Sequence, residues 1–408
     1  MRVLWFEVTE PSGYRNSSLV IAGWQDSLEK ILASEDIELI VAFEDKTGSL
    51  EVKKNGNVTY VPISTRQSIL DRFIGRFSWK PMMKGLLEKM PSVVECYKPD
   101  LIQVFGTEWP FGLVAKCTKV PTVVHIQGSM VPYNNALFPP NYSLSSQLLY
   151  TFPNIKKMFR FFCDYCKTKS RESIERQVWG VVEYYMGRTD WDWSLSQILH
   201  KGCKYFHVEE ALRPIFLSTD KVWKPSKKMR LVSTGISSFW KGPEMMLKTA
   251  RILKEMDCDF EWVVAGNMPR HIKKYVENKE KATFEQNNVN LAGFMGAEAL
   301  IDLLTESTCY VHTAYIENSP NSICEAQVLG VPVVSTNVGG ISTLLEGYEN
   351  SVLVPANDPW RMASAIMRIY ESSQNIKVLN EKVKQRHNPE NIKRELLNAY
   401  RSIAGQKR

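Results

Sequence analysis

Two glutamates lie on either side of an expected helix start in the last third of the chain. Glu317 and Glu325 are eight positions apart in the stretch YIENSPNSICEAQVLG. Ser319 suits an N-cap and Pro320 suits the first helical position, which would leave the next backbone N–H groups unpaired. Such a helix start has the positive end of the helix dipole and attracts a phosphate. The pattern therefore predicts an anion site between two carboxylates.

The expected phosphate donors are the backbone amides of Asn321, Ser322 and Ile323. Glu325, one turn into the helix, could reach past a diphosphate to a ribose diol. Glu317 precedes the helix and could bind hydroxyl groups of a sugar beyond the phosphates. The competing interpretation is a surface capping motif whose acidic residues bind no ligand.

Short apolar runs rich in β-branched residues alternate with amphipathic segments along the whole chain. Continuous apolar runs are typical of strands buried on both faces, as in parallel sheets, so the alternation predicts an α/β fold. The expected strands are 2–8, 37–44, 57–63, 100–106, 121–128, 181–187, 230–235, 260–266, 289–294, 308–314, 331–336 and 351–355.

A segment rich in Lys, Pro and Ser, 208–230, separates the two sets of expected strands. We expect two doubly wound Rossmann-like domains that face a cleft, with ligands at the carboxyl ends of the strands. The first would comprise 1–212 with a C-terminal helix at about 389–408, and the second 213–388. The length of 408 residues suits two such domains.

The composition is that of an ordinary globular protein, with 44% hydrophobic and 23% charged residues. The net charge of +7 favours an anionic partner such as a nucleotide or a membrane surface. No nucleic-acid-binding module is present, so no nucleic-acid partner is expected. The N-terminus does not resemble a signal peptide and no apolar run reaches the ~20 residues of a transmembrane helix. We expect a cytoplasmic protein, with peripheral attachment to the inner membrane face left open.

The C-terminal half has the order and spacing of a known motif set. Residues 309–345 join a strand, the E-x7-E segment, a helix, a strand ending in VVST and a Gly339–Gly340 turn. This resembles the retaining GT-B glycosyltransferases of family 4. The bacterial capsule, exopolysaccharide and O-antigen group is especially similar, because its characteristic segments appear here at 108–110, 127–128, 187–192 and 317–322.

The resemblance implies a donor site in the second domain. Lys241 would bind the donor diphosphate, although the family's usual arginine is absent five or six residues earlier. The backbone around Gly293, Phe294 and Met295 would bind the nucleobase, and Gly266 would lie near the base and ribose. UDP is favoured over GDP.

The resemblance also implies an acceptor site in the first domain. Gly13 follows the first strand and would let the donor phosphates or the acceptor approach the backbone, with an ordinary tight turn as the alternative. Gln127 takes the position of the family's frequent histidine, and Gly128 would face the cleft beside it. His125 is expected in the core instead. Glu108 follows a strand end and would touch the acceptor or the sugar.

The implied reaction transfers a hexose or N-acetylhexosamine from a nucleotide sugar to a saccharide acceptor, with retention of configuration. Lys241, Glu317 and Gln127 are the expected catalytic residues. No cofactor or metal is expected: the acidic pairs at 190–192 and 257–259 look like a metal-binding DxD motif, but the helix start and Lys241 can replace the metal's charge. The lone CxxC at 163–166 has no second pair to complete a metal site.

Two stretches combine basic residues with aromatic and aliphatic ones, 68–90 and 154–171. Such a mixture suits an interfacial helix on an anionic membrane, and a lipid-linked oligosaccharide acceptor would fit that location. The alternative is a packed helix with a solvated basic face. For the whole chain, an epimerase-like enzyme of the same fold and a non-catalytic sugar-nucleotide-binding protein are the competing functions. A nicotinamide dehydrogenase is disfavoured because no GxGxxG follows the first strand.

Overall fold

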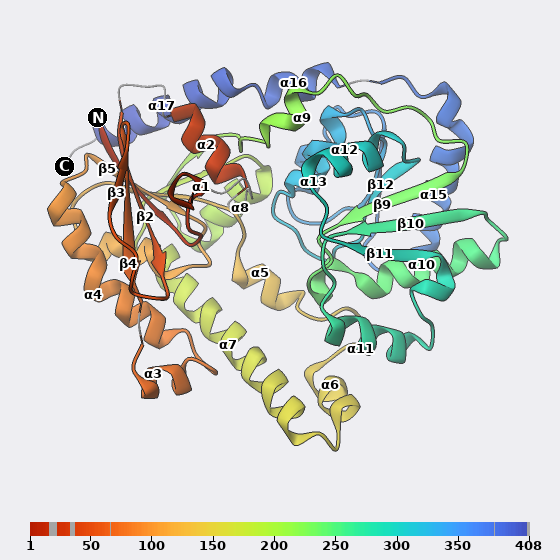
Figure 1. Cartoon of the computed structure of the whole chain (residues 1–408), viewed down its shortest axis with the longest axis horizontal. Helices are drawn as coiled ribbons and strands as arrows, with labels where there is room; N and C mark the ends of the chain where they lie inside the picture. Colours follow the sequence, from red (N-terminus) through yellow and green to blue (C-terminus); the bar gives the residue numbers. More distant parts are fainter. Residues whose placement is uncertain (16–22, 33–36, 66, 379, 406–408) are drawn as a thin grey trace. The chain divides into compact units, whose positions relative to one another are not determined.

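The chain forms two compact units in the computed structural model, which describes residues 1–15, 23–32, 37–65, 67–378 and 380–405 (Figure 1). The first unit comprises Met1–Asn134, Asn154–Arg213 and Arg386–Arg408. The second comprises Asn135–Pro153 and Pro214–Gln385.

The first unit is built on one sheet, in which the described strands follow the order β3-β4-β2-β1-β5-β6-β7-β8. All neighbours are parallel except β3 and β4. The strands are β1 (Arg2–Glu7), β2 (Glu38–Asp45), β3 (Lys53–Asn55), β4 (Val58–Ser64), β5 (Leu101–Phe105), β6 (Thr122–His125), β7 (Tyr184–Gly187) and β8 (Lys204–His207).

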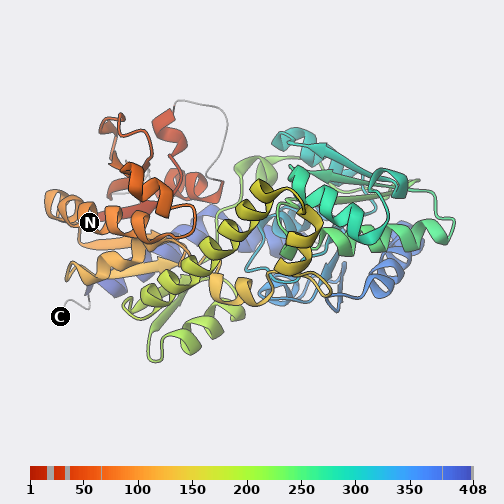
Figure 2. The ribbon, with the colours of Figure 1, turned by 90° about the horizontal axis from the view of Figure 1, so that it is seen from below.

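Helices cover both faces of this sheet, which confirms the doubly wound prediction. Apolar side chains of α4 (Lys80–Tyr97) and α7 (Ile155–Trp179) join the core on one face. Those of α2 (Trp24–Leu32) and α17 (Pro389–Gly405) join the core on the other. Figure 2 shows α7 as the long yellow-green helix. The remaining helices are α1 (Ser12–Arg15), α3 (Ile69–Ile74), η1 (Pro110–Lys116), α5 (Met130–Asn135) and α8 (Asp190–Leu199).

The second unit is built on a parallel sheet whose described strands follow the order β11-β10-β9-β12-β13-β14. Each lies within or beside an expected apolar run. The strands are β9 (Met229–Thr234), β10 (Phe260–Ala265), β11 (Val289–Gly293), β12 (Cys309–His312), β13 (Val333–Thr336) and β14 (Ser351–Val354).

Helices again lie on both faces of the second sheet. The core on one side is filled by α10 (Pro243–Glu255), α11 (Arg270–Glu280) and α15 (Pro359–Ser372). Figure 1 shows α12 (Ala297–Thr305) and α13 (Asn321–Val328) on the other side. The remaining helices are α6 (Leu144–Thr151), α9 (Pro214–Ser218), η2 (Phe239–Lys241), η3 (Glu285–Asn287), α14 (Ile341–Leu345), η4 (Ser373–Asn375) and α16 (Glu381–Arg386).

Two segments differ from the expected domain limits. Residues 135–153 belong to the second unit rather than the first, because Tyr142 packs in its core and Ser146 shares a 2.6 Å hydrogen bond with Tyr275. The segment 208–230 is more than a linker, since Trp223 is buried and its ring N–H donates to the Ser307 carbonyl at 2.7 Å.

No helix in the described part of the chain is both long and apolar enough to span a membrane.

Candidate functional site

Lys241 and Glu317, both predicted as catalytic, form an ion pair in the second unit. Lys241 ends η2, which follows β9, and Glu317 lies in the loop between β12 and α13. His312, the last residue of β12, places its Nε2 3.6 Å from Glu317 Oε2. Thr313 donates a 2.8 Å hydrogen bond from its hydroxyl to the Lys241 carbonyl and so ties the two loops together. The cation and the carboxylate therefore meet at the carboxyl ends of neighbouring strands.

The ionisation of this group is set by burial and by the neighbouring charge. Burial opposes the charge on Glu317, but the Lys241 ammonium and the hydrogen bond from His312 outweigh it and lower the pKa of Glu317 to about 2. Burial also lowers the pKa of His312, against the opposing effect of Glu317. At neutral pH the group is thus an ammonium and a carboxylate beside a neutral imidazole.

Tyr310 is a buried residue of this site that sequence reasoning missed. Its hydroxyl donates to Ser322 Oγ at 2.8 Å and lies 2.9 Å from Thr234 Oγ1. Burial raises the pKa of Tyr310 to about 12, and the charges of Glu317 and Glu325 act in the same direction. The hydroxyl therefore connects β9 and β12 to the first turn of α13, close to both predicted carboxylates. The available signal was a tyrosine among the apolar positions of CYVH.

The start of α13 differs from the prediction by one residue. Pro320, in an extended conformation, occupies the N-cap position and Asn321 is the first helical residue, so Ser319 is not the N-cap. The Ile323 N–H donates to the Pro320 carbonyl at 3.1 Å. The prediction of Ile323 as an unpaired donor was therefore wrong, because the first turn closes on that carbonyl. Asn321 and Ser322 begin the helix and stay the predicted phosphate donors.

Two glycines allow these loops to touch. Gly242, at φ +68°, has the Thr313 carbonyl oxygen 2.0 Å from where a Cβ would lie. Gly339, at φ +54°, has the Glu317 carbonyl oxygen 1.7 Å from that point. Neither position can hold a larger residue without displacing backbone. The Gly339–Gly340 turn thus supports the loop that positions the Glu317 carboxylate.

Glycines also form the edge predicted to bind the nucleobase. Gly235, Gly266 and Gly293, at φ +66°, +100° and +75°, follow or end the neighbouring strands β9, β10 and β11. The Gly266 N–H donates to the Gly293 carbonyl at 2.6 Å. Phe294 is exposed beside them and Met295 is half-buried. The backbone here is accessible to a flat ligand, which suits the predicted role without testing it.

No cation replaces the family's usual arginine at the predicted positions. Gly235 is exposed with a positive φ, and Ile236 is buried. Ser238, two residues later, has a hydroxyl hidden from solvent that makes no hydrogen bond among the described residues. This hydroxyl is a candidate donor to a phosphate.

Glu108, Gln127 and Gly128, predicted on the acceptor side, meet in the first unit. A Cβ placed on Gly106 would lie 2.5 Å from Glu108 Oε2 and 3.2 Å from Gln127 Oε1. A Cβ placed on Gly128 would lie 3.4 Å from Glu108 Oε1. Glu108 Oε2 has no hydrogen-bond partner among the described residues. Burial raises the pKa of Glu108 to about 7. The carboxyl group is therefore poised to gain or lose a proton near neutral pH.

Replacing Glu108 with Gln is expected to stabilise the protein more at pH 8 than at pH 5. A carboxyl whose folded pKa lies above its unfolded value loses stability as pH rises from about 4.5 to about 7. Glutamine lacks this charge, so the gain is of the order of 1–3 kcal/mol at pH 8 and below about 1 kcal/mol at pH 5. Urea unfolding at both pH values measures this gain in the free energy of unfolding. Glu95→Gln, at an exposed position of α4, is the control, and an equal gain at both pH values would contradict the expectation.

Glu175 supports these loops and was also missed. This buried carboxylate of α7 accepts a hydrogen bond from Thr107 Oγ1 at 2.5 Å and another from the Val131 N–H at 2.9 Å. The same hydroxyl oxygen lies 2.9 Å from the Gly128 carbonyl, so its one hydrogen is shared between that carbonyl and Glu175. One side chain therefore fixes the segments after β5 and β6.

The structure gives Gly13 and His125 roles in packing. The Tyr60 hydroxyl lies 2.0 Å from where a Gly13 Cβ would be, and Glu29 Oε1 lies 3.1 Å from that point. The glycine therefore accommodates side chains of its own unit, and the predicted approach of a ligand to it is untested. His125 is fully buried against Trp24, and burial lowers its pKa to about 3, which confirms the expected core position.

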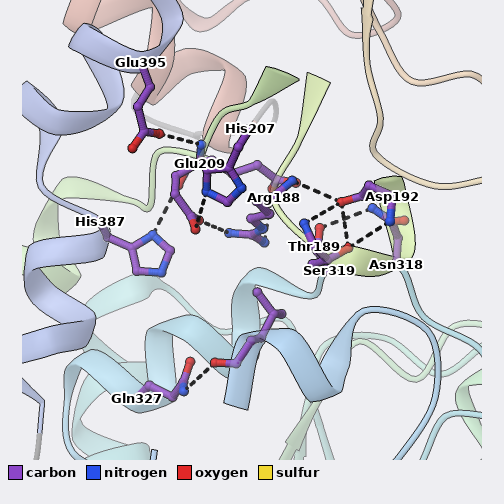
Figure 3. Close-up of polar contacts among 12 residues, drawn as sticks. Arg188, Thr189, Asp192, His207, Glu209, Asn318, Ser319, Gln327, His387 and Glu395 are labelled. Carbon is purple, nitrogen blue, oxygen red and sulfur yellow. Dashed lines mark hydrogen bonds and ion pairs between the residues drawn. The ribbon is translucent and has the colours of Figure 1, made fainter. Parts of the chain in front are cut away.

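A buried polar cluster lies at the points where the chain leaves and re-enters the first unit (Figure 3). Glu209 contacts His207 at 3.5 Å and Arg188 at 3.9 Å, and its N–H donates to Glu395 at 3.2 Å. His387 Nδ1 lies 3.4 Å from the Glu210 carbonyl. The cluster fixes segments 188–210 and 387–395 to each other.

Asp192, one of the two acidic residues at 190–192, has a structural role in this region. Asp192 accepts hydrogen bonds from the Thr189 hydroxyl at 2.7 Å and the Arg188 N–H at 3.1 Å, as the third residue of a capping box that starts α8. One oxygen of its carboxylate, Oδ2, is therefore occupied at the helix start.

Comparison with known proteins identifies a recognised domain in the second unit, which contains Lys241 and Glu317. Residues 218–386 match the family described as glycosyl transferases group 1. Among curated relatives, the 2-deoxystreptamine N-acetyl-D-glucosaminyltransferase of Niallia circulans is 23% identical over 60% of this chain and 66% of its own length. The amylovoran biosynthesis glycosyltransferase AmsK of Erwinia amylovora is 24% identical over 36% of this chain and 37% of its own. The chain spans less than two thirds of either relative.

Solved structures agree along nearly the whole chain. Sucrose-phosphate synthase from Thermosynechococcus elongatus superposes with a TM-score of 0.71 at 14% identity, over 98% of each chain. Anabaena HepE in complex with UDP and glucose gives a TM-score of 0.63 at 12% identity, over 98% of this chain and 100% of its own. At this level of identity the likeness establishes the fold. Residues 218–386 are thus a glycosyltransferase group 1 domain, in a chain that has the GT-B fold of known glycosyltransferase structures.

Proposed function

We propose that the protein is a retaining, metal-independent glycosyltransferase of family 4. It moves a hexose or N-acetylhexosamine from a nucleotide sugar to a saccharide, lipid-linked acceptor in surface polysaccharide assembly. The observation behind this proposal is the contact between Lys241 and Glu317 beside the start of α13. One position thereby offers a cation for a leaving diphosphate and a carboxylate for the hydroxyls of the sugar attached to it.

The proposed chemistry needs no nucleophile from the protein. The bond between the anomeric carbon and the phosphate oxygen breaks, and negative charge develops on the diphosphate. Lys241 and the first amides of α13 stabilise that charge, because fixed charges and dipoles act strongly in a partly dehydrated site. The acceptor oxygen forms its bond on the face that the diphosphate leaves, and its proton passes to the diphosphate. Glu317 orients the sugar, and Glu325 binds the ribose.

The acceptor is assigned to the first unit, where Glu108, Gln127 and Gly128 come together. The buried Glu108 Oε2, which has no hydrogen-bond partner among the residues that the structure describes, suits a sugar hydroxyl. UDP is the favoured nucleotide, which the UDP and glucose complex of HepE supports. The amylovoran relative supports a place in polysaccharide biosynthesis. We place the reaction in the cytoplasm, with the enzyme peripheral to the inner membrane face.

Thermal unfolding with UDP, GDP, UDP-glucose, UDP-N-acetylglucosamine and GDP-mannose tests the donor. A ligand at about 100 times its Kd stabilises by roughly 2.7 kcal/mol, which raises Tm by about 2–4 °C. We expect only UDP and the two UDP-sugars to raise Tm by this amount. The Glu325→Ala variant should lose most of that increase in Tm. Glu298→Ala, at an exposed position of α12, is the matched control.

Other outcomes separate the competing functions. Equal shifts with UDP and GDP ligands would contradict the donor assignment. Binding of a UDP-sugar without transfer or hydrolysis would favour the non-catalytic alternative. Epimerisation of the sugar without an acceptor would favour the epimerase-like one.

A further inference from the structure

A cavity of about 720 Å³ lies in the first unit. It is bounded by the ends of β2 and β4, by α3 and the start of α4, and by the first half of α7. The two basic and aromatic stretches of the sequence, 68–90 and 154–171, therefore line one common space. The charged side chains of its described lining are Lys46, Arg72, Arg76, Arg160, Lys167, Glu44 and Asp164.

Within the described ranges of the chain, most of the cations in this lining lack a carboxylate counter-ion. Lys46 lies 3.8 Å from Glu44. In the described part of the chain, Arg72, Arg76 and Arg160 form no ion pair with a carboxylate, and neither does Lys167. Converging cations without a carboxylate partner attract an anion, and guanidinium groups match the geometry of phosphate oxygens.

An aromatic wall connects the cavity to the predicted acceptor residues. Trp79 and Trp109 line the cavity with ring centroids 4.6 Å apart. The Arg171 guanidinium lies 4.4 Å from the Trp79 ring centroid and donates to the Glu108 carbonyl at 3.4 Å. Because Glu108 and Trp109 are consecutive residues after β5, the segment that carries Glu108 borders the cavity.

Exposed apolar side chains lie beside the cationic cavity. No residue of α3 is buried among the described residues, and the side chains of Ile69 and Phe73 are 79% and 54% exposed. On α7, Ile155 and Phe159 are 76% and 45% exposed. The ring centroids of Phe159 and Phe77 are 5.5 Å apart, which joins α7 to the segment that follows α3 along this apolar rim. A cationic pocket with an apolar rim matches an amphiphile with an anionic head.

The geometry points to a binding site for a single phosphate-bearing lipid. Its phosphate or diphosphate enters the cavity between Arg72, Arg76, Arg160 and Lys167, and its apolar chain lies along the exposed side chains of α3 and α7. The identification of this lipid as the sugar acceptor rests on the proposed function: a sugar attached to the phosphate lies next to Glu108.

Calorimetric titration of the full chain with farnesyl diphosphate, inorganic pyrophosphate and farnesol tests this site. We expect saturable binding of one farnesyl diphosphate, at least tenfold weaker binding of pyrophosphate and none of farnesol. Arg72 and Arg76 are both exposed. A double variant that carries Arg72→Gln and Arg76→Gln should bind farnesyl diphosphate at least tenfold more weakly. The matched control combines Lys116→Gln and Lys119→Gln, two exposed lysines of the same unit outside the cavity, and should leave it unchanged.

Each other outcome overturns the proposal. Equal weakening in both double variants would mean a general charge effect, and equal affinity for pyrophosphate would mean a simple phosphate site. Binding to dioleoylphosphatidylglycerol vesicles without binding of farnesyl diphosphate would mean attachment to a membrane surface only. UDP titrated into the same preparation tests the proposed function separately. Normal UDP binding without farnesyl diphosphate binding rejects the lipid site alone, and the reverse result rejects the donor assignment alone.

Discussion

Replacing Lys241 with methionine is expected to lower the kcat of sugar transfer by about 10²–10³-fold, the usual effect of removing one charge-stabilising donor. The ammonium group comes from the end of η2, after β9, and contacts Glu317 in the loop before α13, where the proposed leaving diphosphate gains charge. Methionine keeps much of the length and apolar stem of lysine but has no charge. The rate falls because the transition state loses a cation that the helix amides cannot replace.

The same substitution also removes the counter-charge of a buried carboxylate. Breaking a buried ion pair by removing one partner destabilises by about 3–5 kcal/mol. A second substitution, Glu317→Gln, removes the carboxylate and should restore most of that stability without restoring transfer. Kinetics at saturating donor and urea unfolding separate the two effects. Lys274→Met, at an exposed position of α11, is the control, and full activity in Lys241→Met would reject the assignment.

The dependence of stability on pH should report this pair. The folded pKa of Glu317, about 2, lies below the ordinary value of 4.5 for a free glutamate carboxyl. A depressed carboxyl pKa contributes stability that is complete above about pH 4.5 and is lost as pH falls towards about 2. Lys241→Met removes the cation responsible, so this variant should lose less stability than the wild type across that interval.

The strands were predictable because most of them are buried on both faces. Runs such as 37–44 and 260–266 have no polar alternation, which is typical of parallel strands between two layers of helices. The two missed strands lack that property. The three residues of β3 are all exposed, and β8 is a short edge strand whose residues are exposed or half-buried. Neither could produce a buried apolar run.

The candidate site was predictable where chemistry follows a local motif. The spacing of Glu317 and Glu325, and a lysine before a Gly-Pro helix start, are visible within short windows. Tyr310, His312 and Glu175 were not found, because their importance depends on contacts between distant segments. Glu175, for example, reaches Thr107 across 68 positions of sequence. The N-cap at Pro320 was missed by one residue, which the conformation of a single proline decided.

Replacing Gly339 with alanine is expected to damage both stability and donor binding. A methyl group at this position would lie 1.7 Å from the Glu317 carbonyl oxygen, so the loop that holds the carboxylate must move. The backbone at φ +54° adds roughly 1–2 kcal/mol for a residue with a Cβ. Forcing extra volume into a packed site adds about 1–3 kcal/mol. The Glu317 carboxylate would then separate from Lys241, and the affinity for a UDP-sugar would fall.

Gly347→Ala provides the comparison that isolates the clash. Gly347 has a φ of +71°, similar to that of Gly339, but no atom lies within 4 Å of its missing Cβ. Both variants therefore incur the backbone cost, and only Gly339→Ala displaces the loop. Urea unfolding and UDP-sugar titration should show a small stability loss with normal binding for Gly347→Ala and losses of both for Gly339→Ala. Equal behaviour of the two variants would mean that the loop tolerates displacement, so that the position of the Glu317 carboxylate would not depend on the glycine turn.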